Sequence, residues 1–140
     1  MDCNALSSNE VSNYCTAPAG RILIVEDDCD TADSLVLALA CNGHGVRAVN
    51  SREAALCVLE KLPQDLVIMD LRMPGMSARE FVCELRQLQP ECAVLLMTAD
   101  TRAELVAAEL GIQHWIAKPF DLDGILNRIA SATDHAPAIA

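Results

Sequence analysis

The stretch Asp65-Leu-Val-Ile-Met-Asp70-Leu-Arg-Met-Pro-Gly-Met76 decides the fold. Residues 66–69 form a continuous apolar run that is too short for a helix, so we expect a strand buried on both faces. The run stops at the carboxylate of Asp70, and Pro74 and Gly75 then turn the chain. Ligands of an open α/β sheet bind beyond the carboxyl ends of its strands, so Asp70 is a candidate site residue. Taken alone, this aspartate could equally cap the helix that follows.

The composition is that of a single globular domain. A chain of 140 residues can bury a substantial core, and with 52% hydrophobic but only 3% aromatic residues we expect that core to be aliphatic. No apolar run approaches a membrane span, and the N-terminus has no secretory-signal pattern, so we expect a cytoplasmic protein without a membrane role. The net charge of −10 argues against direct nucleic-acid binding, because phosphate contacts need clustered Lys and Arg.

Five short apolar runs alternate with helical patterns along the chain. The predicted strands are residues 22–25, 46–49, 66–69, 93–97 and 113–117. The residues that can cap the helices between and after them are Asp30, Ser51, Ser77 and Asp121. This alternation predicts an α/β fold, a parallel sheet with helices on both faces. We expect residues 1–20 to be a flexible leader, residues 21–132 to be the domain and residues 133–140 to be a short tail.

Polar side chains follow four of the predicted strands. They are Glu26 and Asp27 after the first strand, Asp70 after the third, Thr98 after the fourth and Lys118 after the fifth. The carboxyl ends of parallel strands share one edge, so we expect these side chains to converge. Two carboxylates about 5 Å apart repel by roughly 3 kcal/mol at an effective dielectric near 20. Three of them should therefore show raised pKa values or hold a cation, and an open all-oxygen site favours Mg²⁺.

A cation at this edge would allow one carboxylate to attack phosphorus and form an aspartyl phosphate. The Thr98 hydroxyl and the Lys118 ammonium could then each bind a phosphoryl oxygen. Other classes fit the residues less well. An aspartate phosphatase would need Asp-x-Asp, whereas the chain has Asp70-Leu71-Arg72, and a nucleotide hydrolase would need G-x-x-x-x-G-K-[ST], which is absent. A flavin phosphate would be repelled by the acids after the first strand.

Four segments carry a resemblance to a known family. They are Arg21-Ile-Leu-Ile-Val-Glu-Asp27, Val67-Ile-Met-Asp-Leu-Arg-Met-Pro-Gly75, Leu96-Met-Thr-Ala99 and Lys118-Pro-Phe120. In order and spacing, over residues 21–132, the chain resembles the receiver domain of bacterial two-component response regulators. The resemblance implies a flavodoxin-like (βα)5 doubly wound fold with strand order 2-1-3-4-5, as in chemotaxis regulators.

The same resemblance implies a role for each residue at the edge. Asp70 resembles the phosphoacceptor, and Thr98 and Lys118 resemble the switch hydroxyl and the phosphate-pairing lysine. The residues that resemble the Mg²⁺ ligands are Glu26 (through water), Asp27, Asp70 and, through its backbone carbonyl, Arg72. The family also implies a cis peptide bond before Pro119.

The chain departs from the family pattern at three places. Ser77-Ala78 replaces an Asp-Gly pair, and its capping box should preserve the start of the next helix. Trp115 stands at the aromatic switch position, where Tyr or Phe is usual; the alternative is a lone half-buried tryptophan without a switching role. Arg72 and Asp100 flank the path of the water that would hydrolyse the phosphorylated aspartate. An ion pair between them could slow dephosphorylation.

The function implied is that of a stand-alone receiver, a signalling domain rather than an enzyme acting on an external substrate. It would accept a phosphoryl group on Asp70 from a histidine kinase or histidine phosphotransfer protein and would dephosphorylate itself. Phosphorylation would reshape the surface of the fourth helix, fifth strand and fifth helix, which would act on a downstream effector protein. We expect a monomer or weak dimer; an isolated domain of a longer regulator is the alternative.

Overall fold

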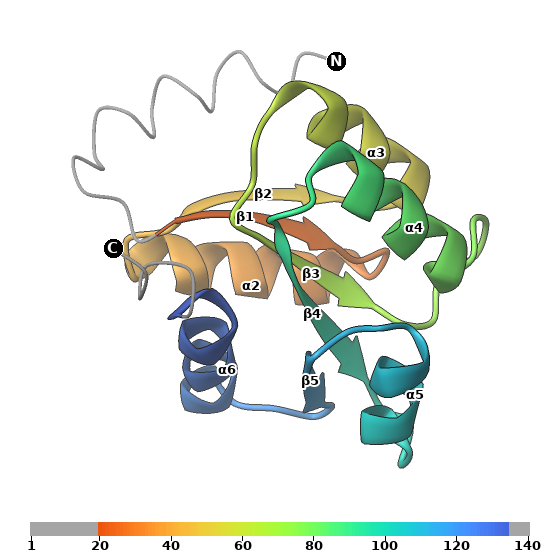
Figure 1. Cartoon of the computed structure of the whole chain (residues 1–140). Helices are drawn as coiled ribbons and strands as arrows, with labels where there is room; N and C mark the ends of the chain where they lie inside the picture. Colours follow the sequence, from red (N-terminus) through yellow and green to blue (C-terminus); the bar gives the residue numbers. More distant parts are fainter. Residues whose placement is uncertain (1–19, 135–140) are drawn as a thin grey trace.

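The computed structural model describes residues 20–134, so nearly all of the predicted leader and most of the predicted tail lie outside the described residues (Figure 1). The strands are β1 (Arg21–Val25), β2 (Gly45–Val49), β3 (Leu66–Asp70), β4 (Ala93–Thr98) and β5 (His114–Ala117). The helices are α2 (Cys29–Cys41), α3 (Arg52–Lys61), α4 (Ala78–Leu88), α5 (Ala103–Glu109) and α6 (Leu122–Asp134). The last helix thus continues past Ala132. No helix within residues 20–134 is both long and apolar enough to cross a bilayer.

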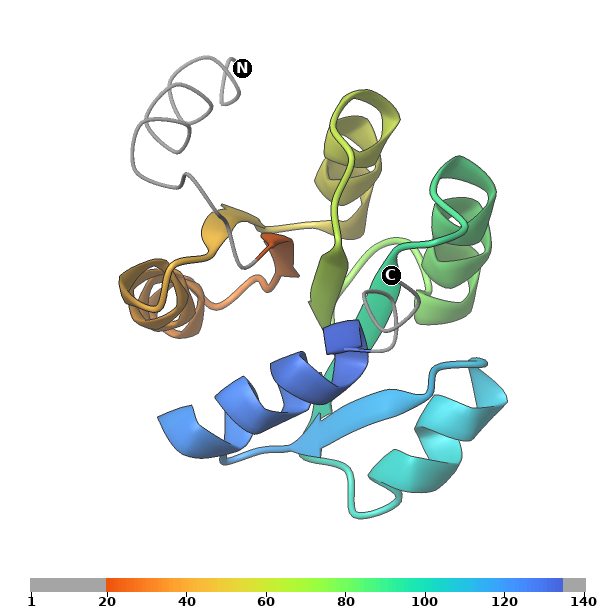
Figure 2. The ribbon, with the colours of Figure 1, turned by 60° about the vertical axis from the view of Figure 1, so that its left-hand side comes forward.

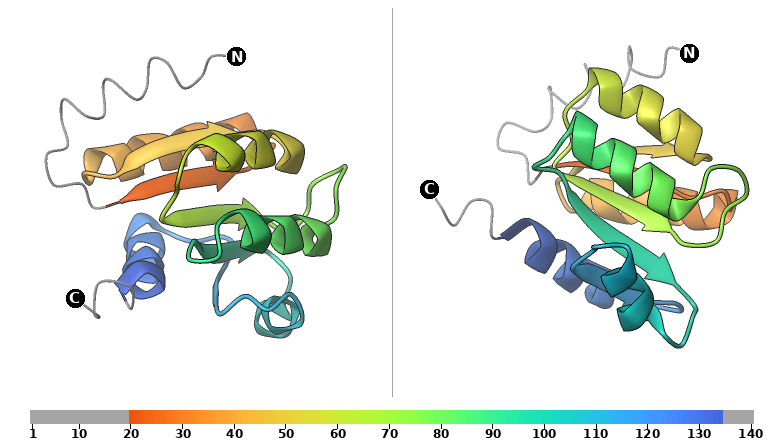
Figure 3. Two further views of the ribbon diagram at one scale, coloured as in Figure 1. Left: turned by 45° about the horizontal axis from the view of Figure 1, so that its top comes forward. Right: turned by 45° about the vertical axis from the view of Figure 1, so that its right-hand side comes forward.

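The five strands form one parallel sheet in the order β2-β1-β3-β4-β5, which confirms the predicted topology. Helices α3, α4 and α5 pack on one face, and α2 and α6 cover the other (Figures 2 and 3). Since both faces are covered, the central strands must be apolar throughout. Leu66 to Met69 are fully buried, as predicted.

Side chains of the central strands alternate between the two halves of the core. Leu23 and Val67 pack toward α3 and α4, whereas Ile24 and Ile68 pack toward α2 and α6. This alternation follows from the two-residue period of a strand. The backbone of β1 and β3 is thereby anchored on both sides, and the residues that follow these strands start from a rigid base.

Capping side chains fix where α2, α3 and α4 begin. Ser51 and Ser77 accept hydrogen bonds from the backbone N–H groups three residues later, at 3.0 and 3.1 Å, as their positions predict. The prediction of Asp30 as the cap of α2 was wrong. The cap is Asp28, whose carboxylate accepts from the Thr31 N–H at 3.1 Å. Asp30 lies in the first turn instead, where its negative charge interacts favourably with the helix dipole.

Candidate phosphorylation site

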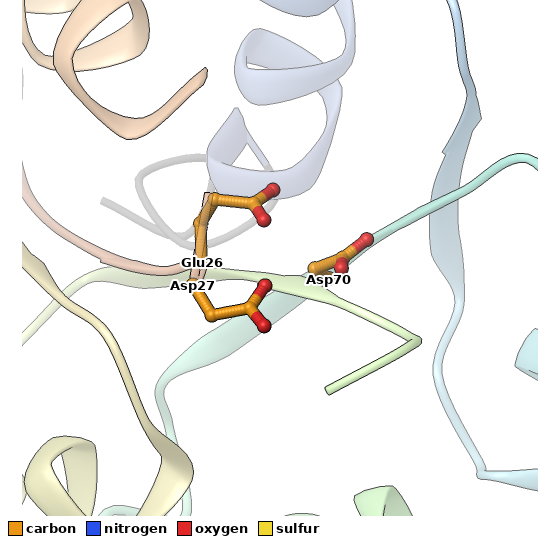
Figure 4. A group of neighbouring side chains, drawn as sticks. All are labelled: Glu26, Asp27 and Asp70. Atoms are coloured by element: carbon orange, nitrogen blue, oxygen red, sulfur yellow. The ribbon is translucent and has the colours of Figure 1, made fainter. Parts of the chain in front are cut away.

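Three carboxylates meet at the carboxyl edge of the sheet. Glu26 and Asp27 directly follow β1, and Asp70 is the last residue of β3. Val25 is in register with Met69, so the residues after them lie side by side. One oxygen from each carboxylate lies within 4.8 Å of the others, and the three side chains gather at this edge (Figure 4). Glu26 and Asp70 are buried, while Asp27 is exposed and keeps the cluster open to solvent.

Lys118 joins this cluster from the far side of β4. It follows β5, and its ammonium Nζ lies 3.0 Å from Asp70 Oδ1 and 3.3 Å from Glu26 Oε1. The Lys118 backbone N–H donates to the Thr98 carbonyl at 2.8 Å, which ties the end of β5 to the end of β4. The Lys118-Pro119 peptide bond is cis, as the resemblance implies. One ammonium thus bridges two of the three carboxylates.

The pKa values of two residues in the cluster, Glu26 and Lys118, are shifted by their surroundings. Burial raises the pKa of Glu26, and the charge of Asp70 adds to this, outweighing the hydrogen bond from the Asp28 N–H and the attraction of Lys118. Burial by itself would lower the pKa of Lys118, but its hydrogen bonds and attraction to Asp70 and Glu26 prevail and raise it. Three acids against one ammonium leave the cluster net negative. These oxygen donors fit a hard divalent cation such as Mg²⁺.

Glu26→Gln is expected to stabilise the metal-free protein at pH 7.5 by about 1 kcal/mol, since it removes one repulsion within a partly screened cluster. Because the folded pKa of Glu26 is raised, its charged form weakens the fold. That penalty is absent at a pH below 4.5, the pKa of this carboxyl in the unfolded chain. It is complete only at a pH above the raised pKa that Glu26 has in the folded protein. Urea unfolding of both proteins at pH 4 and pH 7.5 measures the difference. An equal gain at both pH values would contradict this explanation.

Thr98 lies at the same edge, one position beyond the residue that pairs with Asp70. Asp70 is in register with Met97, and Thr98, only 1% exposed, ends β4. The Thr98 hydroxyl accepts a hydrogen bond from the Asp100 N–H at 3.0 Å. The hydroxyl proton of Thr98 can therefore still be donated to an oxygen bound at this edge of the sheet.

An ion pair joins the loops that follow β3 and β4. The Arg72 guanidinium lies 3.8 Å from Asp100 Oδ2, and the Arg72 side chain is 76% exposed. The hydrogen bond from the Arg102 N–H lowers the pKa of Asp100, assisted by the charges of Arg102 and Arg72. Asp100 therefore stays ionised, and the predicted pairing of Arg72 with Asp100 is present.

The structure adds one buried residue that the sequence did not single out. Arg52, in the first turn of α3, is only 1% exposed, and its guanidinium donates to the carbonyls of Asp70 and of Leu71, the residue after it. Arginine side chains are mostly exposed in folded proteins. No local pattern distinguishes this one, so only the tertiary structure could reveal it.

Comparisons with known proteins agree with this arrangement. The family model described as "Response regulator receiver domain" matches residues 22–130. The response regulator protein FleR of Pseudomonas aeruginosa is 37% identical over 114 residues, which is 80% of this chain and 24% of FleR. The transcriptional regulatory protein FixJ of Bradyrhizobium diazoefficiens is 32% identical over 123 residues, 86% of this chain and 60% of FixJ. The chain therefore spans only part of the length of these relatives.

Solved structures show the same fold. A putative response regulator from Chloroflexus aurantiacus superposes with a TM-score of 0.77 at 30% identity, covering 84% of this chain and 98% of that one. A CheY-like receiver domain protein from Methanospirillum hungatei gives a TM-score of 0.78 at 24% identity, covering 86% of this chain and 98% of that one. With its acidic edge, its bridging lysine and a family match over nearly the whole described domain, the chain belongs to the receiver domains of two-component response regulators.

Proposed function

We propose that this chain accepts a phosphoryl group on Asp70 from a histidine kinase or histidine phosphotransfer protein, with Mg²⁺ bound, and signals to a downstream effector protein. Receiver domains in general are phosphoacceptor signalling domains with an acidic Mg²⁺ pocket, and they receive phosphate from histidine kinases. The observation that carries the proposal is the placement of Asp70 between two further carboxylates and an ammonium 3.0 Å away. A phosphoacceptor needs this combination of a nucleophile, a cation site and a fixed positive charge.

Each residue of the edge has a defined part in the proposed reaction. An Asp70 carboxylate oxygen forms the new bond to phosphorus as the bond from phosphorus to the donor breaks. Asp27, Asp70 and the Arg72 carbonyl would hold Mg²⁺ directly and Glu26 would hold it through water; the ion would neutralise charge on the phosphoryl oxygens. Lys118, already at Asp70, pairs with one phosphoryl oxygen, and the Thr98 hydroxyl donates to another.

A small phosphodonor tests the proposal directly. Incubation with acetyl phosphate and MgCl₂ should add one phosphoryl group per chain, stable in acid and labile in base, as intact-mass spectrometry would show. EDTA should prevent the addition. Rapid, repeated release of phosphate without a stable phosphoprotein would instead identify a hydrolase and overturn the proposal.

The Arg72–Asp100 ion pair is expected to lengthen the life of the phosphoprotein, because it spans the path of the attacking water. Arg72→Ala or Asp100→Ala should shorten the phosphoryl half-life by about two- to fivefold, since solvent weakens an ion pair whose arginine side chain is 76% exposed. The double variant should be no faster than the single ones. Decay of the purified phosphoprotein measures this, and an unchanged half-life rejects the role.

The proposed output surface comprises α5, β5 and α6. Trp115 on β5 is half-buried, and the Arg128 guanidinium of α6 lies 5.1 Å from the centre of its ring. Trp115 is in register with Leu96, on the strand that ends in Thr98. A movement of Thr98 toward a phosphoryl group would therefore act on the strand that supports Trp115. This connection supports a switching role for the tryptophan.

A further inference from the structure

The first turn of α3 holds the loop that follows Asp70. Arg52 Nη2 donates to the carbonyls of Asp70 at 3.0 Å and Leu71 at 2.8 Å. Arg52 Nη1 donates to the carbonyl of Met76 at 2.7 Å and approaches that of Met73 at 3.4 Å. One buried guanidinium thus gathers four carbonyls, one at the end of β3 and three from the loop that follows it.

Glu53, the next residue of α3, holds the same loop from its exposed side. Its carboxylate accepts a hydrogen bond from the Met76 N–H at 3.1 Å. Gly75 lies against this carboxylate with a φ of +92°, and an added Cβ would approach Glu53 Oε2 to 3.0 Å. The loop therefore has little freedom to take another path.

The carbonyls that Arg52 binds lie on both sides of Arg72. Within residues 70–73, the guanidinium contacts every carbonyl except that of Arg72. This is the carbonyl proposed above as a Mg²⁺ ligand. A backbone ligand can be positioned only through its neighbouring peptide groups, because it has no side-chain torsion to adjust.

We propose that Arg52 is a positioning residue for the Mg²⁺ site, holding the peptide groups on both sides of Arg72 so that the Arg72 carbonyl is preorganised as a ligand. The inference rests on the proposed function, in which Mg²⁺ binds at this edge. Partners of this kind, which orient metal ligands without touching the metal, typically affect metal affinity by about 10- to 100-fold.

If Arg52 acted only through its charge, replacing it with a neutral residue would strengthen Mg²⁺ binding instead of weakening it. Burial lowers the pKa of the Arg52 guanidinium, while the charges of Asp70, Glu53 and Asp27 favour its protonated form. If its charge alone mattered, removing it would make the cluster more negative and would strengthen Mg²⁺ binding. The direction of the change in affinity therefore separates positioning from electrostatics.

The test compares Arg52→Lys, which keeps the charge but cannot gather four carbonyls, with Arg52→Met, which removes both. We expect both to raise the Mg²⁺ dissociation constant about tenfold, measured from amide chemical shifts during MgCl₂ titration. Arg21→Met is the matched control, because Arg21 is exposed at the opposite end of β1, and it should bind like the wild type. A merely structural role would lower the stability of the metal-free protein but leave the dissociation constant of its folded molecules unchanged.

Folded Arg52 variants that bind Mg²⁺ within twofold of the wild type, or more tightly, would overturn the inference. If both variants fail to fold, Gly75→Ala decides, since it disturbs the same loop without touching Arg52. It should also weaken Mg²⁺ binding about tenfold, and an unchanged constant overturns the inference. A wild-type protein that binds no Mg²⁺ would refute both proposals, whereas equal binding by wild type and variants refutes only this one.

Discussion

Asp70→Asn is expected to abolish phosphorylation, reducing the incorporation from acetyl phosphate from one phosphoryl group per chain to none. The amide has the size of the carboxylate and its oxygen can still accept from Lys118, 3.0 Å away in the wild type, so the fold should be preserved. A neutral amide oxygen is, however, too weak a nucleophile to attack phosphorus. Intact-mass spectrometry after incubation with acetyl phosphate and MgCl₂ measures the loss.

Asp33→Asn provides the control for Asp70→Asn. Asp33 is an exposed residue of α2, and replacing it changes the net charge by the same amount without altering the edge of the sheet. It should be phosphorylated like the wild type. Phosphate captured by Glu26 or Asp27 in Asp70→Asn would contradict the assignment of Asp70 as the sole acceptor.

Lys118→Met is expected to have the second largest effect. Among residues 20–134, Lys118 supplies the only lysine or arginine nitrogen within ion-pair distance of Glu26 and Asp70. Unpairing a buried charge costs about 3–5 kcal/mol, and with the Lys118 side chain 28% exposed we expect about 2 kcal/mol at pH 7.5 without metal. Phosphorylation should slow by at least about tenfold, because a positive charge at the developing phosphoryl oxygens is lost.

The stability lost in Lys118→Met should depend on pH. The raised pKa of Lys118 keeps the ammonium charged. Its contribution to stability is therefore full at a pH below 10.5, the pKa of lysine in the unfolded chain, and is lost only as the pH rises through the pKa of Lys118 in the folded protein. At the acidic side, Glu26 has a raised pKa and takes up a proton early, after which it no longer needs the ammonium. The deficit, the loss in free energy of unfolding of Lys118→Met relative to the wild type, should therefore be smaller at pH 4 than at pH 7.5.

Urea unfolding at both pH values, with and without MgCl₂, measures this deficit. Bound Mg²⁺ should restore part of the lost stability by replacing the missing positive charge. Lys61→Met is the control, since Lys61 is the chain's other lysine and is exposed at the end of α3. Equal deficits at pH 4 and pH 7.5 would show that packing, rather than charge, accounts for the loss.

The strands and helices were predictable because their signals are local. The apolar run before Asp70 has the length and composition of a doubly buried strand, and Ser51 and Ser77 cap their helices as predicted. The cap of α2 was misassigned because Asp28 and Asp30 are both capping residues by type. Only the backbone path after Glu26 decides which carboxylate reaches an N–H three residues later. The order of the strands came from the family resemblance, since local patterns do not specify which strands pair.

The sequence by itself determined that carboxylates, a hydroxyl and a lysine would gather at one edge, because parallel strands all point their carboxyl ends the same way. Only the tertiary structure decided which of these atoms touch. Lys118 reaches Glu26 across 92 positions of sequence, and Arg52 is buried only because a loop 18 to 24 residues away folds over it. Burial and hydrogen-bond partners depend on such distant segments, whereas periodicity and chain direction are written in consecutive residues.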